Sequence, residues 1–176
     1  IPTEWLVHFN RFLQVGMTMF HLKKILICAV QGAAFGFGFD LAVVGDFTIM
    51  AGGTVLGLTE NDRLSADMMM MLPYLTNMKT AKRLMFMYEK LTAQDALEMG
   101  LVNKVVPADK LMEEAEAWAN RLAVVPSITL EQHKRAINHA YDLAGLREAF
   151  EFNVQSGALI EQSADREARK ERNEFV

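Results

Sequence analysis

The sequence predicts an α/β fold in which strands and helices alternate over residues 1–107 and helices alone form residues 108–176. Three observations lead to this prediction. An unbroken apolar run at 25–30 is typical of a strand in a parallel sheet, two glycines at 36 and 38 precede a short apolar helix, and the last third has helical periodicity throughout. With 51% hydrophobic residues in 176, the chain can fill one sizeable core.

The chain is expected to begin with a helix followed by a strand. Apolar residues recur every three or four positions between residues 5 and 22, which is the period of an amphipathic helix. The run 25–30, closed by Gly32, predicts a strand that is buried on both faces. Gly36 and Gly38 then indicate a tight turn and the N-terminus of a helix, where backbone N–H groups are exposed.

Short elements are expected next. Residues 47–50 and 54–58 flank two glycines and predict two short strands with a turn between them. The run 82–86 favours a helix. Thr92 and Asp95 have the spacing of a capping-box variant that opens another helix, and Gly100 stands where left-handed caps close one. A strand over 101–106 then leads to Pro107.

The C-terminal part is expected to be helical, with helices over 111–125, 129–143 and 146–160. No linker rich in Gly, Ser or Pro separates these helices from the strands, and the sequence shows no internal repeat. We therefore expect two regions, a core over 1–107 and a helical appendage over 108–176.

Composition excludes several classes of protein. Neither the net charge of −4 nor the distribution of charges provides the basic surface that nucleic acids need. Cys28 is the only cysteine, which excludes a disulfide framework and a cysteine-based zinc site and favours a reducing compartment. No stretch is long and apolar enough for a membrane span, and the first residues lack the pattern of a signal peptide. We expect a soluble intracellular protein.

Two groups of residues are candidates for chemistry. In the turn at 32–40, glycines allow a ligand to approach a helix N-terminus, where free N–H groups stabilise a carbonyl oxygen that becomes negative. The same glycines are also explained by a tight turn and close packing of the helix. Asp40 and Glu60 follow apolar stretches, so each is either a general acid or base with a raised pKa or a satisfied cap. Asp46 and Asp62 are better explained as turn or capping residues.

The segments VQGAAFGFGFDLAVVGDF, TVLGLTE, SAD and KLTAQDALEMGLVNKVVP together resemble the crotonase (enoyl-CoA hydratase/isomerase) superfamily over essentially the whole chain. The resemblance implies the crotonase (ClpP/crotonase-like) fold, with repeated β-β-α turns and a C-terminal helical region that forms trimers, often paired as hexamers. It also implies an enzyme of fatty acid metabolism that acts on acyl-CoA in the cytoplasm, or in mitochondria or peroxisomes of a eukaryote.

Residue roles follow from the same resemblance. Phe37, with Gly36 beside it, falls where the family places one of two N–H donors of its oxyanion hole. Asp40 and Glu60 fall on the two acid/base positions, and Asp67 resembles a third acidic residue of some isomerases. The remaining turn residues correspond to the substrate-binding backbone: Gly32, Ala34, Phe35 and Gly38. The acid pattern is closest to that of dienoyl-CoA isomerases.

The implied reaction is hydration or isomerisation of a double bond through a thioester enolate, with coenzyme A as part of the substrate and no metal or separate cofactor. Two alternatives stay open. One is an acyl-CoA hydrolase of the same family, which uses the same enolate stabilisation. The other is a non-catalytic or truncated crotonase that serves as a binding or assembly subunit. Because the chain starts inside a helical pattern without Met, we expect it to be a fragment that lacks the family's N-terminal part, with its second oxyanion donor.

The sequence departs from the family pattern at two places. Phe37 stands where the usual turn has a glycine, and Met68 to Met71 replace a glycine pair. The four methionines either fill the core or line a site for an acyl chain. Other residues are expected to be structural. The four histidines have no Ser or Cys partner at a suitable spacing: His8, His21, His133 and His139. The C-terminal charges form a solvated helix face or approach the CoA phosphates of a neighbouring subunit: Arg166, Lys170 and Arg172.

Overall fold

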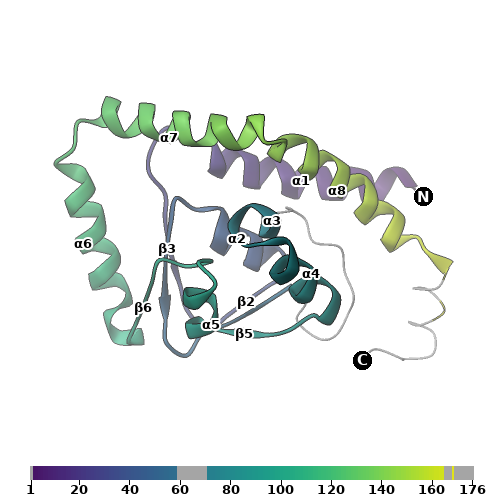
Figure 1. Cartoon of the computed structure of the whole chain (residues 1–176), viewed down its shortest axis with the longest axis horizontal. Coiled ribbons are helices and arrows are strands. Elements are labelled where there is room, and N and C mark those ends of the chain that lie inside the picture. Colours follow the sequence, from purple (N-terminus) through teal and green to yellow (C-terminus); the bar gives the residue numbers. More distant parts are fainter. Residues whose placement is uncertain (1, 59–70, 165–167, 169–176) are drawn as a thin grey trace.

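Two three-stranded sheets form the centre of the part of the chain that the structure describes, and helices cover them (Figure 1). The structure, a computed structural model, describes residues 2–58, 71–164 and 168. The first sheet has the order β1-β3-β6 and is parallel throughout. The second has the order β2-β4-β5, with β2 parallel and β5 antiparallel to β4. The strands are β1 (Ile27–Val30), β2 (Ala33–Phe35), β3 (Phe47–Ala51), β4 (Val55–Gly57), β5 (Leu91–Thr92) and β6 (Lys104–Val106).

The chain alternates between the two sheets. After β1, two residues lead into β2 in the other sheet, and α2 (Phe37–Val44) then returns the chain to β3, beside β1. A second short turn places β4 beside β2. The two strands expected on either side of the glycine pair are therefore confirmed, and they belong to different sheets. Neither β2 nor β5 was predicted, because each is too short to show a period of its own.

The strand expected at 25–30 is confirmed as a parallel strand, whereas the prediction that both its faces are buried is wrong. Ala29 is exposed, and the other residues of β1 are half-buried. Among the described strands, β1 lies at the edge of its sheet and has β3 as its one neighbour, so less of it is covered. The central strand β3 has the expected burial instead, because Ile49 and Met50 have no exposed surface.

Long helices lie along one side of the strands, and their positions agree with the helical periods of the sequence. Figure 1 shows α7 (Ser127–Leu143) and α8 (Leu146–Glu161) running beside α1 (Pro2–Phe20), and α6 (Leu111–Ala123) at the flank of the first sheet. Helix α8 packs directly against α1. The largest core cluster contains both Phe39 of α2 and Phe150 of α8, so the C-terminal helices share the core of the strands.

Shorter helices follow β4 in the sequence. Helices α3 (Leu72–Leu75) and α4 (Met78–Met87) precede β5, and α5 (Ala93–Glu98) lies between β5 and β6. The 3₁₀ turn η1 (Ala108–Lys110) follows β6. The predicted capping box is confirmed, since the Thr92 hydroxyl accepts the Asp95 N–H and the Asp95 carboxylate accepts the Thr92 N–H. The Asp95 carboxylate also accepts the Thr92 hydroxyl at 2.6 Å, and this bond, together with the one from the Thr92 N–H, lowers the pKa of Asp95. Gly100 adopts the expected left-handed conformation, with φ of 77°. Of the four consecutive methionines, Met71 is a core residue, and the others lie outside the described residues.

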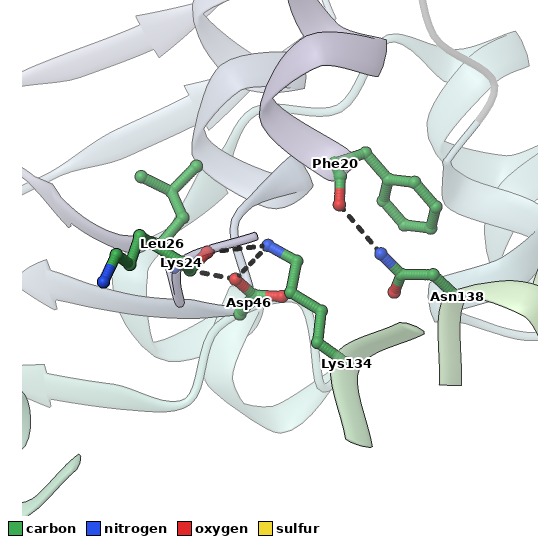
Figure 2. A network of polar contacts seen from close by, with 6 residues as sticks. All are labelled: Phe20, Lys24, Leu26, Asp46, Lys134 and Asn138. Carbon is green, nitrogen blue, oxygen red and sulfur yellow. Dashed lines mark hydrogen bonds and ion pairs between the residues drawn. The ribbon is translucent and has the colours of Figure 1, made fainter. Parts of the chain in front are cut away.

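A buried network of polar contacts holds α7 against the rest of the fold (Figure 2). Lys134 donates to the Asp46 carboxylate at 2.6 Å and to the Lys24 carbonyl at 3.2 Å. The same carboxylate oxygen accepts the Leu26 N–H at 2.7 Å. One turn further along α7, Asn138 donates to the carbonyl of Phe20 at the end of α1.

Among the helices of the described residues, none combines the length and the apolar character that crossing a membrane requires.

Replacing Lys134 by Met should lower the free energy of unfolding by about 3 kcal/mol, because the change leaves a partly buried carboxylate without its cation. The Lys134 side chain is only 4% exposed and the Asp46 side chain 19%, so water replaces little of the lost contact. Urea unfolding followed by circular dichroism measures the change. Lys23→Met is the matched control, since the Lys23 side chain is 82% exposed and lies 4.0 Å from Glu131. That variant should lose at most about 0.5 kcal/mol, and equal losses in the two variants would contradict a special role for the buried pair.

Candidate active site

The glycine-rich turn lies between the two sheets and orients the start of α2. Gly32, after β1, and Gly36, after β2, have φ angles of 80° and 53°, which side chains disfavour. Gly36 is the N-cap of α2 and donates its N–H to the carbonyl of Gly57 in β4 at 3.2 Å. The turn is therefore fixed to the second sheet immediately before the helix begins.

The first backbone N–H groups of α2 point out of the end of the helix. The Gly36 carbonyl accepts the N–H groups of Phe39 and Asp40 at 2.9 and 3.2 Å, so it points along the helix. Because the peptide bond between Gly36 and Phe37 is trans, the Phe37 N–H points the opposite way, away from the helix end. Within the part of the chain that the structure describes, the N–H groups of Phe37 and Gly38 have no acceptor.

Asp40 lies in the first turn of α2 and is fully buried. It is the one charged residue of a helix whose other residues are apolar or glycine. Its neighbours Phe39 and Val43 are core residues. A buried carboxyl group next to a helix N-terminus is the kind of group that enzymes use to transfer protons.

The other turn residues that the sequence singled out form the strand that leads to this helix. Ala34 is buried and pairs with Leu56, and Phe35 is half-buried and pairs with Gly57. Gly32 and Gly38 are exposed, and a side chain at either position would meet nothing within 4 Å. The remaining acidic candidates, Glu60, Asp62 and Asp67, lie outside the described residues and stay predictions.

An aromatic contact beside the helix start was not predicted from the sequence. The Phe37 ring packs on Phe12 of α1 in an edge-to-face contact, with ring centroids 4.5 Å apart. His8, one turn earlier on α1, also packs on Phe12, with ring centroids 4.7 Å apart. The sequence signal for Phe12 is weak, because it lies beside the apolar stripe of α1 and 25 residues before Phe37.

Two other features are separate from this site. An apolar cavity of about 360 Å³ lies at the opposite end of α2, between Val44, Phe47, Tyr74 and Ile137. Met71, a candidate for the lining of an acyl chain, contributes to it, whereas none of the described residues of the glycine-rich turn does. Cys28 is half-buried, and burial raises the pKa of its thiol, which keeps it in the protonated form. The described residues contain no group of His, Cys, Asp or Glu side chains that could hold a metal ion.

Comparison with known proteins identifies similar sequences and structures. The family model described as enoyl-CoA hydratase/isomerase matches residues 8–176. The Bacillus subtilis (strain 168) protein YngF, named for an enoyl-CoA hydratase/isomerase, is 32% identical over 146 residues, which is 81% of this chain and 53% of the relative. The mitochondrial enoyl-CoA hydratase of Pongo abelii is 30% identical over 146 residues, which is 76% of this chain and 47% of the relative.

Solved structures give the same result. The crystal structure of an enoyl-CoA hydratase/isomerase from Xanthobacter autotrophicus Py2 matches with a TM-score of 0.90 and 27% identity, over 99% of this chain and 66% of that one. The chain thus spans about half the length of the curated relatives that it matches.

Gly36→Ala should lower the free energy of unfolding by about 1–2 kcal/mol, because an alanine has to adopt a positive φ. The cost is conformational, since the nearest atom to the added methyl group would be the Leu58 carbonyl oxygen, at an ordinary 3.7 Å. Gly38→Ala, two residues away in open space, should change stability by less than about 1 kcal/mol. Thermal and urea unfolding of both variants test this difference, and an equally stable Gly36→Ala variant would show that the turn relaxes freely.

Proposed function

We propose that this chain, which belongs to the enoyl-CoA hydratase/isomerase family, acts on an acyl-CoA thioester. In this proposal it hydrates or shifts a double bond through a thioester enolate. In this proposal the Phe37 N–H is one donor to the enolate oxygen. Asp40 and Glu60 are the acid/base pair, and Asp67 assists if the reaction is an isomerisation.

The open N–H groups of Phe37 and Gly38 are the single observation that carries the proposal. They lie at the positive end of the α2 dipole, where a developing negative charge is stabilised. A donor of this kind is most effective when it is already oriented before the reaction, and one such donor contributes about 3–4 kcal/mol to the transition state of well-studied enzymes. The bond from Gly36 to Gly57 supplies that orientation.

The acid/base roles follow from the chemistry of the enolate. In an isomerisation, a carboxylate removes a proton from the acyl chain, the electron pair moves to the thioester oxygen, and a carboxylic acid returns a proton to a different carbon as the carbonyl re-forms. In a hydration, a carboxylate takes a proton from water while the water oxygen adds to the β-carbon and the electron pair of the double bond moves to the thioester oxygen. An acid then protonates the α-carbon as the carbonyl re-forms. Asp40, buried one turn from the Phe37 N–H, suits either role.

The acid pattern Asp40, Glu60 and Asp67 favours isomerisation over hydration within this proposal. Because the chain spans about half of its curated relatives, the activity, the acyl group and the assembly are proposals for the whole protein. We propose a trimer or a hexamer built through the C-terminal helices, following the family resemblance.

Incubation with enoyl- and dienoyl-CoA thioesters in D2O tests the function, with mass spectrometry to locate deuterium in the acyl chain. We expect incorporation by the unmodified protein and a loss of about 100-fold or more in Asp40→Asn and Glu60→Gln, because an amide cannot accept the proton. Asp109→Asn, at an exposed carboxylate of η1, is the matched control and should retain the full rate.

The product identifies the subclass. A shifted double bond indicates an isomerase, added water indicates a hydratase, and release of free CoA indicates a hydrolase. Binding of CoA thioesters by a folded protein without any incorporation would contradict the enolate proposal and favour a binding subunit.

A further inference from the structure

We propose that Phe12 of α1 is a positioning residue for the oxyanion donor, because its ring holds the Phe37 side chain against α1 and away from the open N–H at the start of α2. This inference rests on the proposed function, and it assigns a role in that site to a residue of a different helix.

The first step is the contact itself. The rings of Phe12 and Phe37 meet edge to face, with centroids 4.5 Å apart and planes at 64°. This is a preferred geometry for aromatic pairs, and both residues are half-buried. Phe12 is in turn held by His8, whose ring meets it edge to face at 78°. The pair therefore selects one orientation of the Phe37 ring.

The second step is that nothing in the turn itself would hold this ring. Phe37 is the first residue of α2, so no preceding helical turn restricts its side-chain rotamer. Its neighbours on both sides are glycines, which have no side chains to pack against it. Beside Gly38 there is open space within 4 Å of where a Cβ would be. Among the described residues, Phe12 supplies the one aromatic contact of the Phe37 ring, so losing it would allow the ring to turn toward the helix end.

The third step concerns the position of the N–H. The Phe37 ring and the Phe37 N–H belong to the same residue, and the N–H points out from the helix end without an acceptor among the described residues. In another rotamer the ring would lie across the space in front of that N–H, where the thioester oxygen has to bind. A glycine at this position would need no such restraint, whereas a phenylalanine does.

The test combines Phe12→Ala, Phe12→Leu, Phe37→Gly and the double variant Phe12→Ala with Phe37→Gly. Two readouts are measured: kcat and KM with an enoyl-CoA substrate, and the ultraviolet absorbance of the enolate formed from bound acetoacetyl-CoA. The enolate band reports oxyanion stabilisation without turnover. Phe86→Ala removes a 70% exposed ring from α4 and is the matched control.

We expect Phe12→Ala to lower kcat about tenfold with a smaller change in KM, less than the roughly 100-fold loss typical when an oxyanion donor is removed. The enolate band should fall in parallel, and Phe12→Leu should restore most of both signals. In the Phe37→Gly background the Phe12→Ala change should have no further effect, because no ring is left to move. Phe86→Ala should match the unmodified protein.

Two results would overturn the inference while the proposed function stands. One is a Phe12→Ala variant whose enolate band and kcat equal those of the unmodified protein. The other is an equal loss from Phe12→Ala with and without the Phe37 ring, which would mean that Phe12 only supports the packing of α1. An unmodified protein that gives neither turnover nor an enolate band would instead overturn the proposed function, and the positioning role with it.

Discussion

The carboxylate of Asp46 joins three segments that are far apart in the sequence, and the arrangement around α2 depends on it. One of its oxygens accepts the Leu26 N–H just before β1 and the ammonium group of Lys134 from α7, 88 residues later. The pair is largely shielded from water, so its attraction is stronger than that of a surface ion pair, and removing either partner would leave a buried charge. This contact fixes the C-terminal end of α2 and the turn into β3.

Helix α2 is consequently held at both ends. Asp46 fixes the residues that follow it, and the bond from Gly36 to Gly57 fixes the residue that precedes it. Between these points the helix packs by its apolar side chains, with Asp40 as its one charged residue. A donor at the end of so constrained a helix costs little reorganisation when a charge develops in front of it, which is the condition for effective electrostatic stabilisation.

The crotonase fold expected from the residue pattern is confirmed by the structural match, in which nearly the whole chain superimposes on part of a longer relative. The part of the candidate site that the structure describes is one end of α2, with its open N–H groups and the buried carboxyl group of Asp40. The contact of Phe12 with Phe37 places α1 beside the start of α2. Glu60 and Asp67 remain predictions from the sequence.

The sequence by itself determined the features that depend on neighbouring residues. The long helices follow from apolar periods, the start of α5 from the spacing of Thr92 and Asp95, and the helix start at Phe37 from the two glycines around it. Only the tertiary structure decided which of the described strands pair and that β1 lies at the edge of its sheet. It also decided that Lys134 meets Asp46 and that Phe12 meets Phe37. The physical reason is distance along the chain. Periodicity and capping act over about four residues, whereas pairing of short strands and contacts between helices depend on how the whole chain packs.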